Sequence, residues 1–138
     1  MRRYLLDSTP LAGYLSGRQH FVERIAPLLS RREVATSVLV YAEIVEYLKG
    51  LPYFPRRRTQ LRTLLQAVYP YFLTYPILDR YADIRRALRP PFGPGLIGDI
   101  DTLIAATALE RNLTVITTDT DFTRVPDLQT LILPRGTR

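Results

Sequence analysis

The sequence predicts an α/β fold: a three-layer sandwich with a mainly parallel central sheet flanked by helices. Short apolar runs that are typical of buried strands alternate with longer segments of helical periodicity along the chain. Strands that are separated by helices pair in parallel, through right-handed crossovers. With 138 residues, 46% of them hydrophobic, the chain is sufficient for one domain with a substantial core, which we expect to span residues 1–138.

In the first half of the chain, two apolar runs are predicted as strands: residues 3–6 and 33–37. After the first strand, Ser8 or Thr9 can cap a helix whose first turn accommodates Pro10. The next helix is expected at residues 20–29, and it should end or kink near its proline, which removes a hydrogen bond from a helix interior. After the second strand, helical spacing continues up to a stop at Gly50.

In the second half of the chain, helices are expected at residues 59–68, 77–88 and 101–111, and strands at residues 71–75, 113–118 and 128–133. Leucines at helical spacing define one face of the first of these helices. β-branched residues favour the strand LTVITT, and the final strand has the weakest pattern. Residues 53–58 are expected to form a connection, and residues 119–122 a turn.

The chain is strongly basic, with a net charge of +6 and 19 lysine and arginine residues, of which only Lys49 is lysine. A basic chain favours a polyanionic partner, although a solvated surface explains the charge almost as well. The absence of cysteine excludes disulfides and thiolate metal sites. Apolar runs fall short of the roughly 20 residues of a membrane helix, and the N-terminal segment reaches Asp7 too early for a secretory signal. We therefore expect a cytoplasmic protein without membrane contact.

Four acidic residues fall at the ends of expected strands or on the helices next to them: Asp7, Glu43, Asp101 and Asp119. In a doubly wound sheet these places converge at one edge. Clustered carboxylates repel one another, so a site that gathers them needs a cation. An all-oxygen set of ligands suits Mg²⁺ or Mn²⁺ rather than zinc, and the single histidine, His20, is expected to have a surface or core role.

Each of these acids also has a purely local interpretation. Asp7 can begin a turn, and Glu43 can be a solvated helix residue, although its neighbours are apolar. Asp101 can cap or charge the start of a helix. Asp119 and Asp121 can form Asx turns. The joint placement of the acids, rather than any one of them, indicates a site.

Four segments carry a family resemblance: YLLDST, TSVLVYAEI, DTLIAATAL and LTVITTDTDF. With them the chain resembles the PIN-domain nucleases, and most closely the VapC-type ribonuclease toxins of bacterial toxin–antitoxin pairs. The resemblance implies a PIN-like fold in which the four acids named above line a Mg²⁺ or Mn²⁺ site, with Ser8 and Thr117 or Thr118 as polar supports. One small departure is Val40, where the family often has threonine.

The resemblance also implies a function: metal-dependent endonucleolytic hydrolysis of RNA phosphodiester bonds by a homodimer that a cognate antitoxin restrains. Asp7, Glu43 and Asp101 would hold metal, and Asp119, with Asp121, would orient water or a second ion. Two other functions remain open from the sequence. One is a PIN-like module that binds RNA or protein without cleaving, and the other is a PIN nuclease that acts on DNA.

Asp99 lies two residues before Asp101, and residues two apart on a helix do not face the same way. Asp99 is therefore interpreted as a helix cap or as an outer ligand that acts through water. The candidate RNA-binding residues are Arg56, Arg57, Arg58, Arg85, Arg86 and Arg124. A solvated helix face is the alternative for each arginine cluster. Some of the nine tyrosines are expected at an interface, because tyrosine has an apolar and a polar end.

Overall fold

The computed structural model describes residues 1–136, so residues 137 and 138 of the predicted domain lie outside it. Within this range the structure has a five-stranded sheet in the order β3-β2-β1-β4-β5. The strands are β1 (Tyr4–Leu6), β2 (Val34–Ser37), β3 (Tyr69–Tyr71), β4 (Thr114–Thr117) and β5 (Thr130–Ile132). All four pairings are parallel, which confirms the predicted sheet and makes it more uniform than expected.

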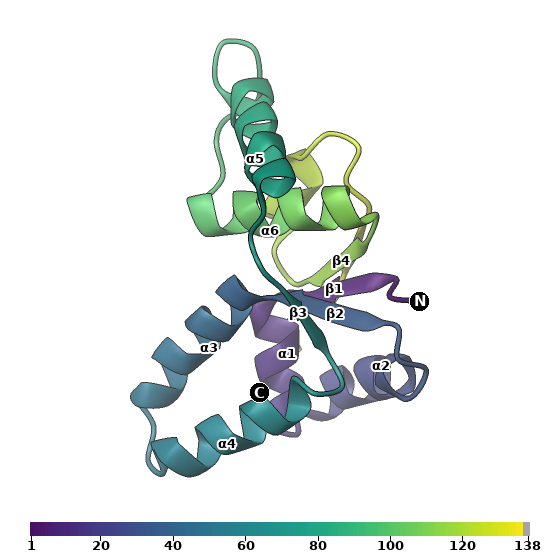
Figure 1. Cartoon of the computed structure of the whole chain (residues 1–138), viewed down its shortest axis with the longest axis vertical. Coiled ribbons are helices and arrows are strands. Elements are labelled where there is room, and N and C mark those ends of the chain that lie inside the picture. The colour runs from purple at the N-terminus through teal and green to yellow at the C-terminus, as the bar shows by residue number, and fades with distance from the viewer. Residues whose placement is uncertain (137–138) are drawn as a thin grey trace.

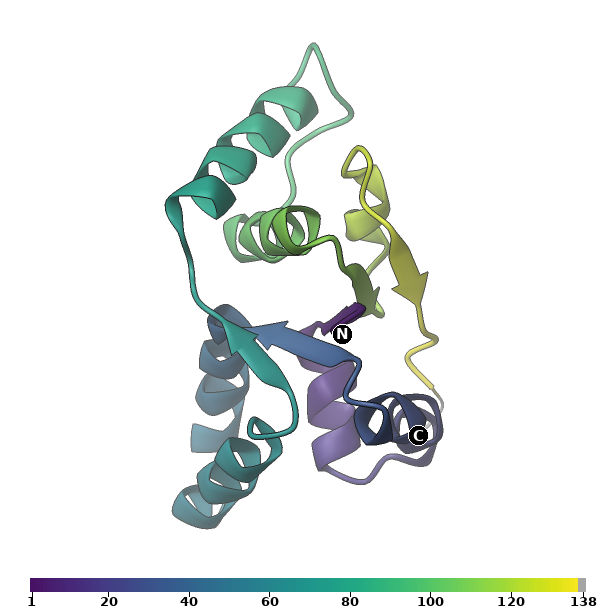
Figure 2. The same cartoon turned by 45° about the vertical axis from the view of Figure 1, so that its right-hand side comes forward.

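Helices cover both faces of this sheet, as the prediction of three layers requires. The helices are α1 (Ser8–Leu15), α2 (Gln19–Ser30), α3 (Val38–Lys49), α4 (Phe54–Leu64), α5 (Tyr75–Leu88), α6 (Asp99–Arg111) and the short 3-10 helix η1 (Thr120–Arg124). Helices α1 to α4 lie on one side of the sheet, and α5 and α6 on the other (Figures 1 and 2). In the part of the chain that the structure describes, no helix combines the length and apolar character that a membrane span needs.

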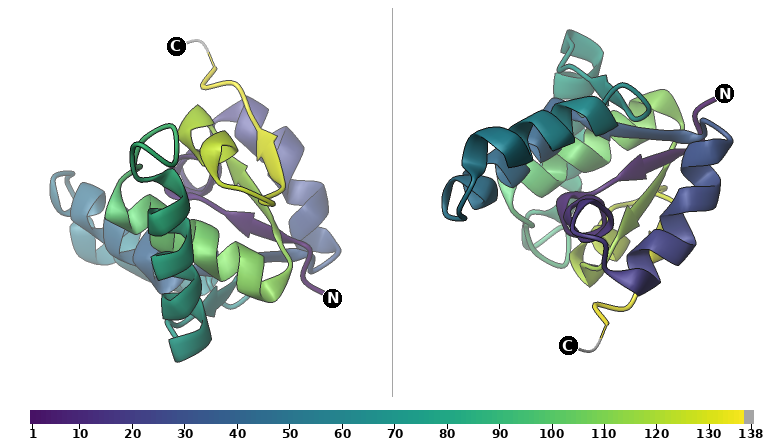
Figure 3. Two further views of the ribbon diagram at one scale, coloured as in Figure 1. Left: turned by 90° about the horizontal axis from the view of Figure 1, so that it is seen from above. Right: turned by 90° about the horizontal axis from the view of Figure 1, so that it is seen from below.

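The strand order creates a switch point between β1 and β4. From β1 the chain builds outward through β2 to β3 with helices on one face, and then crosses to β4 through α5 and α6 on the other face. The views along the vertical axis show β1 and β4 side by side in the middle of the molecule (Figure 3). Ligands of such sheets bind beyond the carboxyl ends of the strands, where the direction of winding reverses.

The core lies between the sheet and its two helical layers. Leu5 and Val115, on adjacent central strands, have no exposed surface. Ala105 and Ala106 of α6 are likewise fully buried, and their small side chains let this helix lie close to the sheet. On the other face, Gly13 of α1 lies against the ring of Phe21 in α2, where an added Cβ would collide with the ring.

Strand β3 and helix α4 differ from the sequence prediction. Strand β3 begins at Tyr69 rather than at residue 71, because an edge strand tolerates Pro70, which has no N–H to pair. Helix α4 begins at Phe54, with a proline in its first turn, so the expected connection at residues 53–58 is wrong. Helix α2 spans Gln19–Ser30 with Pro27 inside it, so the helix expected at residues 20–29 is confirmed and does not end at its proline.

Candidate active site

Strands β1 and β4 bring Asp7 and Asp119 to the same edge of the sheet. Asp7 follows β1 directly, and Asp119 lies two residues beyond β4. The hydroxyl of Thr117, the last residue of β4, donates a hydrogen bond of 2.7 Å to Asp7 Oδ2. The hydroxyl oxygen of Thr117 in turn accepts a hydrogen bond of 3.0 Å from the backbone N–H of Asp119. Thr117 therefore links the two acids, and Thr118 lies buried between it and Asp119.

Helices α3 and α6 add Glu43 and Asp101 to this pair. Burial raises the pKa of Glu43, and the charge of Asp7 raises it further, while a hydrogen bond from the Ser8 hydroxyl acts in the opposite direction. Burial is also the main cause that raises the pKa of Asp101 to about 7, followed by the charges of Asp7, Asp119, Glu43 and Asp121. The acids that the sequence singled out thus form one electrostatically coupled group, which we call the acid cluster: Asp7, Glu43, Asp101 and Asp119.

The acid cluster contains buried acceptor atoms that have no donor. Asp7 is only 6% exposed, and burial raises its pKa. Its Oδ1 atom and the Oε1 atom of Glu43 are buried without a hydrogen-bond partner. A buried carboxylate oxygen without a donor is costly. Such an atom is therefore suited to a cation that enters the cluster.

The donor set fits a hard divalent cation by its chemistry. Oxygen ligands suit Mg²⁺ and Mn²⁺, and a cation would offset the mutual repulsion that raises these pKa values. Among residues 1–136, no three acidic or histidine side chains already stand in the geometry of a complete metal-binding group. The acids therefore share one electrostatic environment without meeting at a single point. His20 lies elsewhere, with its ring nitrogen 3.0 Å from the carbonyl oxygen of Pro134.

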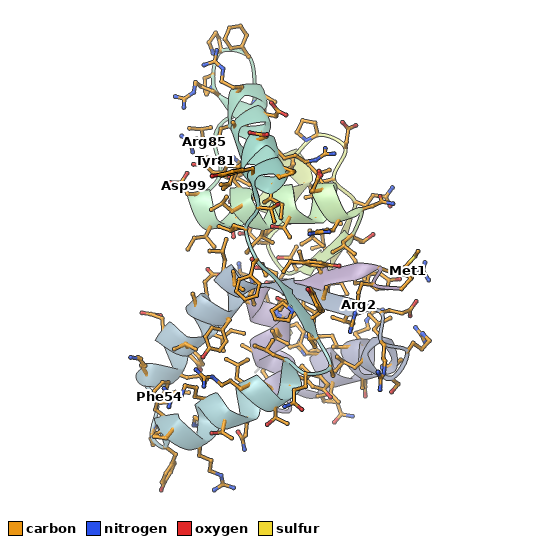
Figure 4. The ribbon with its side chains drawn as sticks, viewed as in Figure 1. Met1, Arg2, Phe54, Tyr81, Arg85 and Asp99 are labelled. Carbon is orange, nitrogen blue, oxygen red and sulfur yellow. The ribbon has the colours of Figure 1, made fainter. Side chains whose placement is uncertain are left out.

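Asp99 is directed toward α5 rather than into the acid cluster. Its Oδ1 atom accepts hydrogen bonds from the hydroxyl of Tyr81 at 3.0 Å and from the guanidinium of Arg85 at 2.8 Å (Figure 4). The N-cap of α6 is Gly98, and Asp99 is the first residue of the helix. Asp101 lies about half a helical turn further on, and it is the aspartate whose pKa is raised by burial and by the charges of the other acids. The two neighbouring aspartates thus have different surroundings.

The predicted RNA-binding arginines divide into two groups. Arg85 is paired with Asp99, and Arg124 is paired with Asp121 at 2.8 Å. Both arginines therefore neutralise acids next to the cluster. On α4, the guanidinium of Arg58 lies 5.3 Å from the ring centre of Phe54. The remaining arginines of this set, Arg56 and Arg57 on α4 and Arg86 on α5, lie outside the cluster.

A groove of about 640 Å³ opens beside the acid cluster, between α1 and α3. Ser8 and Glu43 belong to its walls, so the groove and the cluster share residues. Tyr47, one of the tyrosines considered for an interface, also lines it, as do Glu46 and Ile100, which the sequence had not assigned to a site. The sequence contained only a weak indication of this groove, namely the small residues along α1. They leave space next to α3 only when the two helices pack together.

A family model for the PIN domain matches residues 4–128. The chain belongs to the PIN domain family. No curated protein sequence matches the chain.

Solved structures with the same fold support this membership. The chain is similar to VapBC-1 from nontypeable Haemophilus influenzae, with 25% identity and a TM-score of 0.79 over 94% of this chain and 96% of that one. It is similar to VapBC2 from Rickettsia felis bound to a promoter DNA fragment, with 20% identity and a TM-score of 0.82 over 94% and 98% of the two chains. It is also similar to DNA-bound VapBC from Salmonella typhimurium, with 19% identity and a TM-score of 0.83 over 96% and 98%. The expected resemblance to VapC-type PIN toxins is confirmed.

Proposed function

We propose that this PIN domain is a metal-dependent endoribonuclease and the toxin of a VapBC-type toxin–antitoxin pair, acting as a single domain in the cytoplasm. The observation that carries the proposal is the acid cluster at the switch point of the sheet, with the two buried carboxylate oxygens that have no donor. Family membership supports the nuclease activity, and the oxygen donors support Mg²⁺ or Mn²⁺.

In this proposal Asp7, Glu43 and Asp101 hold the divalent cation. Bound there, the cation supplies Lewis-acid stabilisation of the charge that develops on the phosphate. Asp119, with Asp121 beside it, orients the attacking water. Thr117 keeps the Asp7 carboxylate in place through its hydrogen bond, and Ser8 is the polar neighbour that lowers the pKa of Glu43. Thr118 completes the polar support.

Two protein partners belong to the proposal. A cognate antitoxin is supported by the similarity to VapBC complexes. A homodimer is supported by an exposed apolar surface around β3 and the start of α5, where Phe72 is 70% and Tyr75 84% exposed, and Tyr69 and Leu78 are exposed as well. Exposed apolar patches of this kind mark interaction sites.

Arginines outside the cluster are the proposed contacts to RNA phosphates. Arg56, Arg57, Arg58 and Arg86 lie on α4 and α5, and guanidinium groups suit phosphate oxygens. Arg85 and Arg124 are already paired with acids, so an RNA contact by either one requires its ion pair to open.

The proposal is tested by incubating the purified protein with a structured RNA and with single- and double-stranded DNA, in Mg²⁺, in Mn²⁺ and in EDTA. RNA cleavage should require the metal, and Asp101→Asn should reduce it by at least about 100-fold, because a ligand charge is lost. Asp99→Asn is the matched control, since its carboxylate faces Arg85 and Tyr81, and it should keep most of the activity. Cleavage of DNA alone would assign the protein to the DNA nucleases, and binding without any cleavage would make it a non-catalytic module.

A further inference from the structure

The loop between α5 and α6 folds back on the end of α5 as an ordered turn. Phe92 and Gly93 donate their backbone N–H groups to the carbonyl of Arg89, at 3.0 and 3.1 Å. A Cβ added at Gly93 would collide with the backbone of α5, so only glycine fits where the turn packs against the helix. We call residues 86–94 the α5 tip, and it lies at the end of α5 that points away from the sheet (Figures 1 and 2).

Phe92 stands on this turn with its side chain uncovered. It is 82% exposed, and Pro91 and Pro94 on either side of it are exposed as well. Proline fixes the φ angle of the backbone, so these two neighbours have little conformational freedom to lose when a partner binds. An exposed apolar ring on a backbone that is already ordered is a favourable contact for a partner. The α5 tip therefore has the character of a recognition site.

The charge of the α5 tip favours an anionic partner. Arg86 lies in the last turn of α5 and Arg89 at its C-terminal cap, and both are exposed. In the part of the chain that the structure describes, neither of these arginines forms an ion pair. Residues 84–98 contain no aspartate or glutamate. Two guanidinium groups thus precede Phe92 without an acid among their sequence neighbours, and guanidinium groups suit phosphate oxygens.

The loop that carries the tip also leads to the acid cluster. It enters α6, whose first turn contains Asp99 and Asp101, and Figure 1 shows it returning along one side of α5 to that end of α6. The guanidinium of Arg124 lies 3.5 Å from the carbonyl of Leu96 in this loop, which joins the loop to η1. Asp99 follows Phe92 by 7 positions, a span of at most about 25 Å. One folded RNA can therefore reach the tip and the acid cluster together.

We infer that the α5 tip is a second contact for the RNA substrate, in which Phe92 stacks on an unpaired base while Arg86 and Arg89 bind neighbouring phosphates. An exposed aromatic ring together with cationic groups is the combination with which proteins bind unpaired nucleotides. An acidic peptide would match the charges as well, but the position of the tip on the loop that leads to the acid cluster favours the RNA. The inference rests on the proposed function for its substrate, and it adds a contact that selects among RNAs at a distance from the cleaved bond.

Fluorescence anisotropy with a fluorescein-labelled RNA hairpin, in EDTA to prevent cleavage, tests this inference. The hairpin has a short stem that is closed by a loop of unpaired adenosines. Phe92→Ala should weaken its binding by about 10-fold, because base–aromatic stacking is lost. Phe92→Tyr keeps the aromatic face and should bind like the wild type. A blunt-ended duplex of the same stem has no unpaired base, so the wild type and Phe92→Ala should bind it equally.

A second arm of the experiment examines the phosphate contacts. Arg86→Gln and Arg89→Gln should each reduce the slope of log K against log salt concentration by about 0.7, the value expected for one phosphate of a single strand. Arg24→Gln is the matched control and should bind like the wild type, because Arg24 is also exposed on a helix but lies on α2, across the sheet from the tip.

Three results would overturn the inference. Hairpin binding by Phe92→Ala that equals the wild type, with or without losses in the arginine variants, would show that no base stacks on the tip. Equal losses by Phe92→Ala on the hairpin and on the duplex would show that the ring does not select unpaired bases. A loss in Arg24→Gln as large as those in the two tip arginines would show only a general attraction between the basic protein and RNA.

The outcome is separable from that of the nuclease test. Metal-dependent RNA cleavage together with unchanged hairpin binding by Phe92→Ala would overturn the tip contact and leave the nuclease proposal standing. The expected binding pattern without any cleavage would support the tip contact and reject the nuclease. Thermal melts of Phe92→Ala should match the wild type, because the ring is exposed.

Discussion

Replacing Asp101 with asparagine is expected to stabilise the metal-free protein at alkaline pH. Burial and four neighbouring acids raise the pKa of Asp101 to about 7 in the folded protein, from an ordinary value of 3.8. Between about pH 4 and pH 7 the folded protein therefore keeps a proton that the unfolded chain has lost. The free energy of unfolding falls as the pH rises through this window. Asparagine does not titrate, so the variant does not lose this free energy of unfolding as the pH rises.

The size of the effect follows from the two pKa values. The difference between about 7 and 3.8 corresponds to at most about 4 kcal/mol, since each pKa unit is worth about 1.4 kcal/mol. Asp101 is partly exposed, and solvent screening reduces this to about 2 kcal/mol. For a domain of this size, that difference should raise the melting temperature by about 8 °C at pH 8, and the gain should shrink toward zero near pH 4.

The assay is thermal unfolding followed by circular dichroism in EDTA, at pH values from 4 to 8. Asp99→Asn is the control, because it makes the same chemical change two residues earlier, where the carboxylate is paired with Arg85. This control should gain no stability at any pH. If Asp101→Asn melted at or below the wild-type temperature at pH 8, the repulsion assigned to the acid cluster would be wrong.

Further outcomes are expected from the same structure. Thr117→Val should lower the free energy of unfolding by about 1–3 kcal/mol, because Asp7 loses a buried donor; Thr107→Val, which removes only a bond to a carbonyl within α6, should cost less in a urea titration. Mg²⁺ at about 100 times its dissociation constant should add about 2.7 kcal/mol in the wild type and much less in Asp101→Asn, as differential scanning calorimetry can measure. Light scattering should give twice the 15.9 kDa chain mass, and Tyr75→Glu should shift it toward the monomer. Expression of the wild type alone should arrest bacterial growth, and expression of Asp101→Asn should not.

Much of the fold could be predicted because hydrophobic periodicity indicates which segments form strands and which form helices. The carboxyl ends of the strands before Asp7 and Asp119 were predicted to within one residue, since both strands are short, buried and followed by acids. Proline misled the prediction at other places. Pro70 hid the start of an edge strand, and Pro27 suggested an end or a kink in a helix that continues to Ser30. Local preferences of proline predict breaks in helices and strands, but they take no account of the packing that keeps these elements in place.

The gathering of the four acids was predictable to the extent that strand ends locate them. Asp7, Glu43, Asp101 and Asp119 come together because parallel strands and their helices converge. The pairing of Arg85 with Asp99 was not predictable, because it depends on how α5 lies across α6. The groove beside Glu43 depends in the same way on the distance between α1 and α3. Sequence patterns identify faces of helices, but they do not give the angle at which two helices cross.

The central position of β1 has a consequence for the protein during its synthesis. The first strand to leave the ribosome can pair with β2 early, but its other neighbour, β4, is made last but one. The bond between Thr117 and Asp7 joins residues 110 positions apart, which corresponds to roughly 5–20 s of translation. Throughout that interval the nascent chain lacks Asp119, and for most of it Asp101 as well. The complete acid cluster can therefore assemble only after the last strands have emerged, so any chemistry that needs all four acids begins only when synthesis is nearly finished.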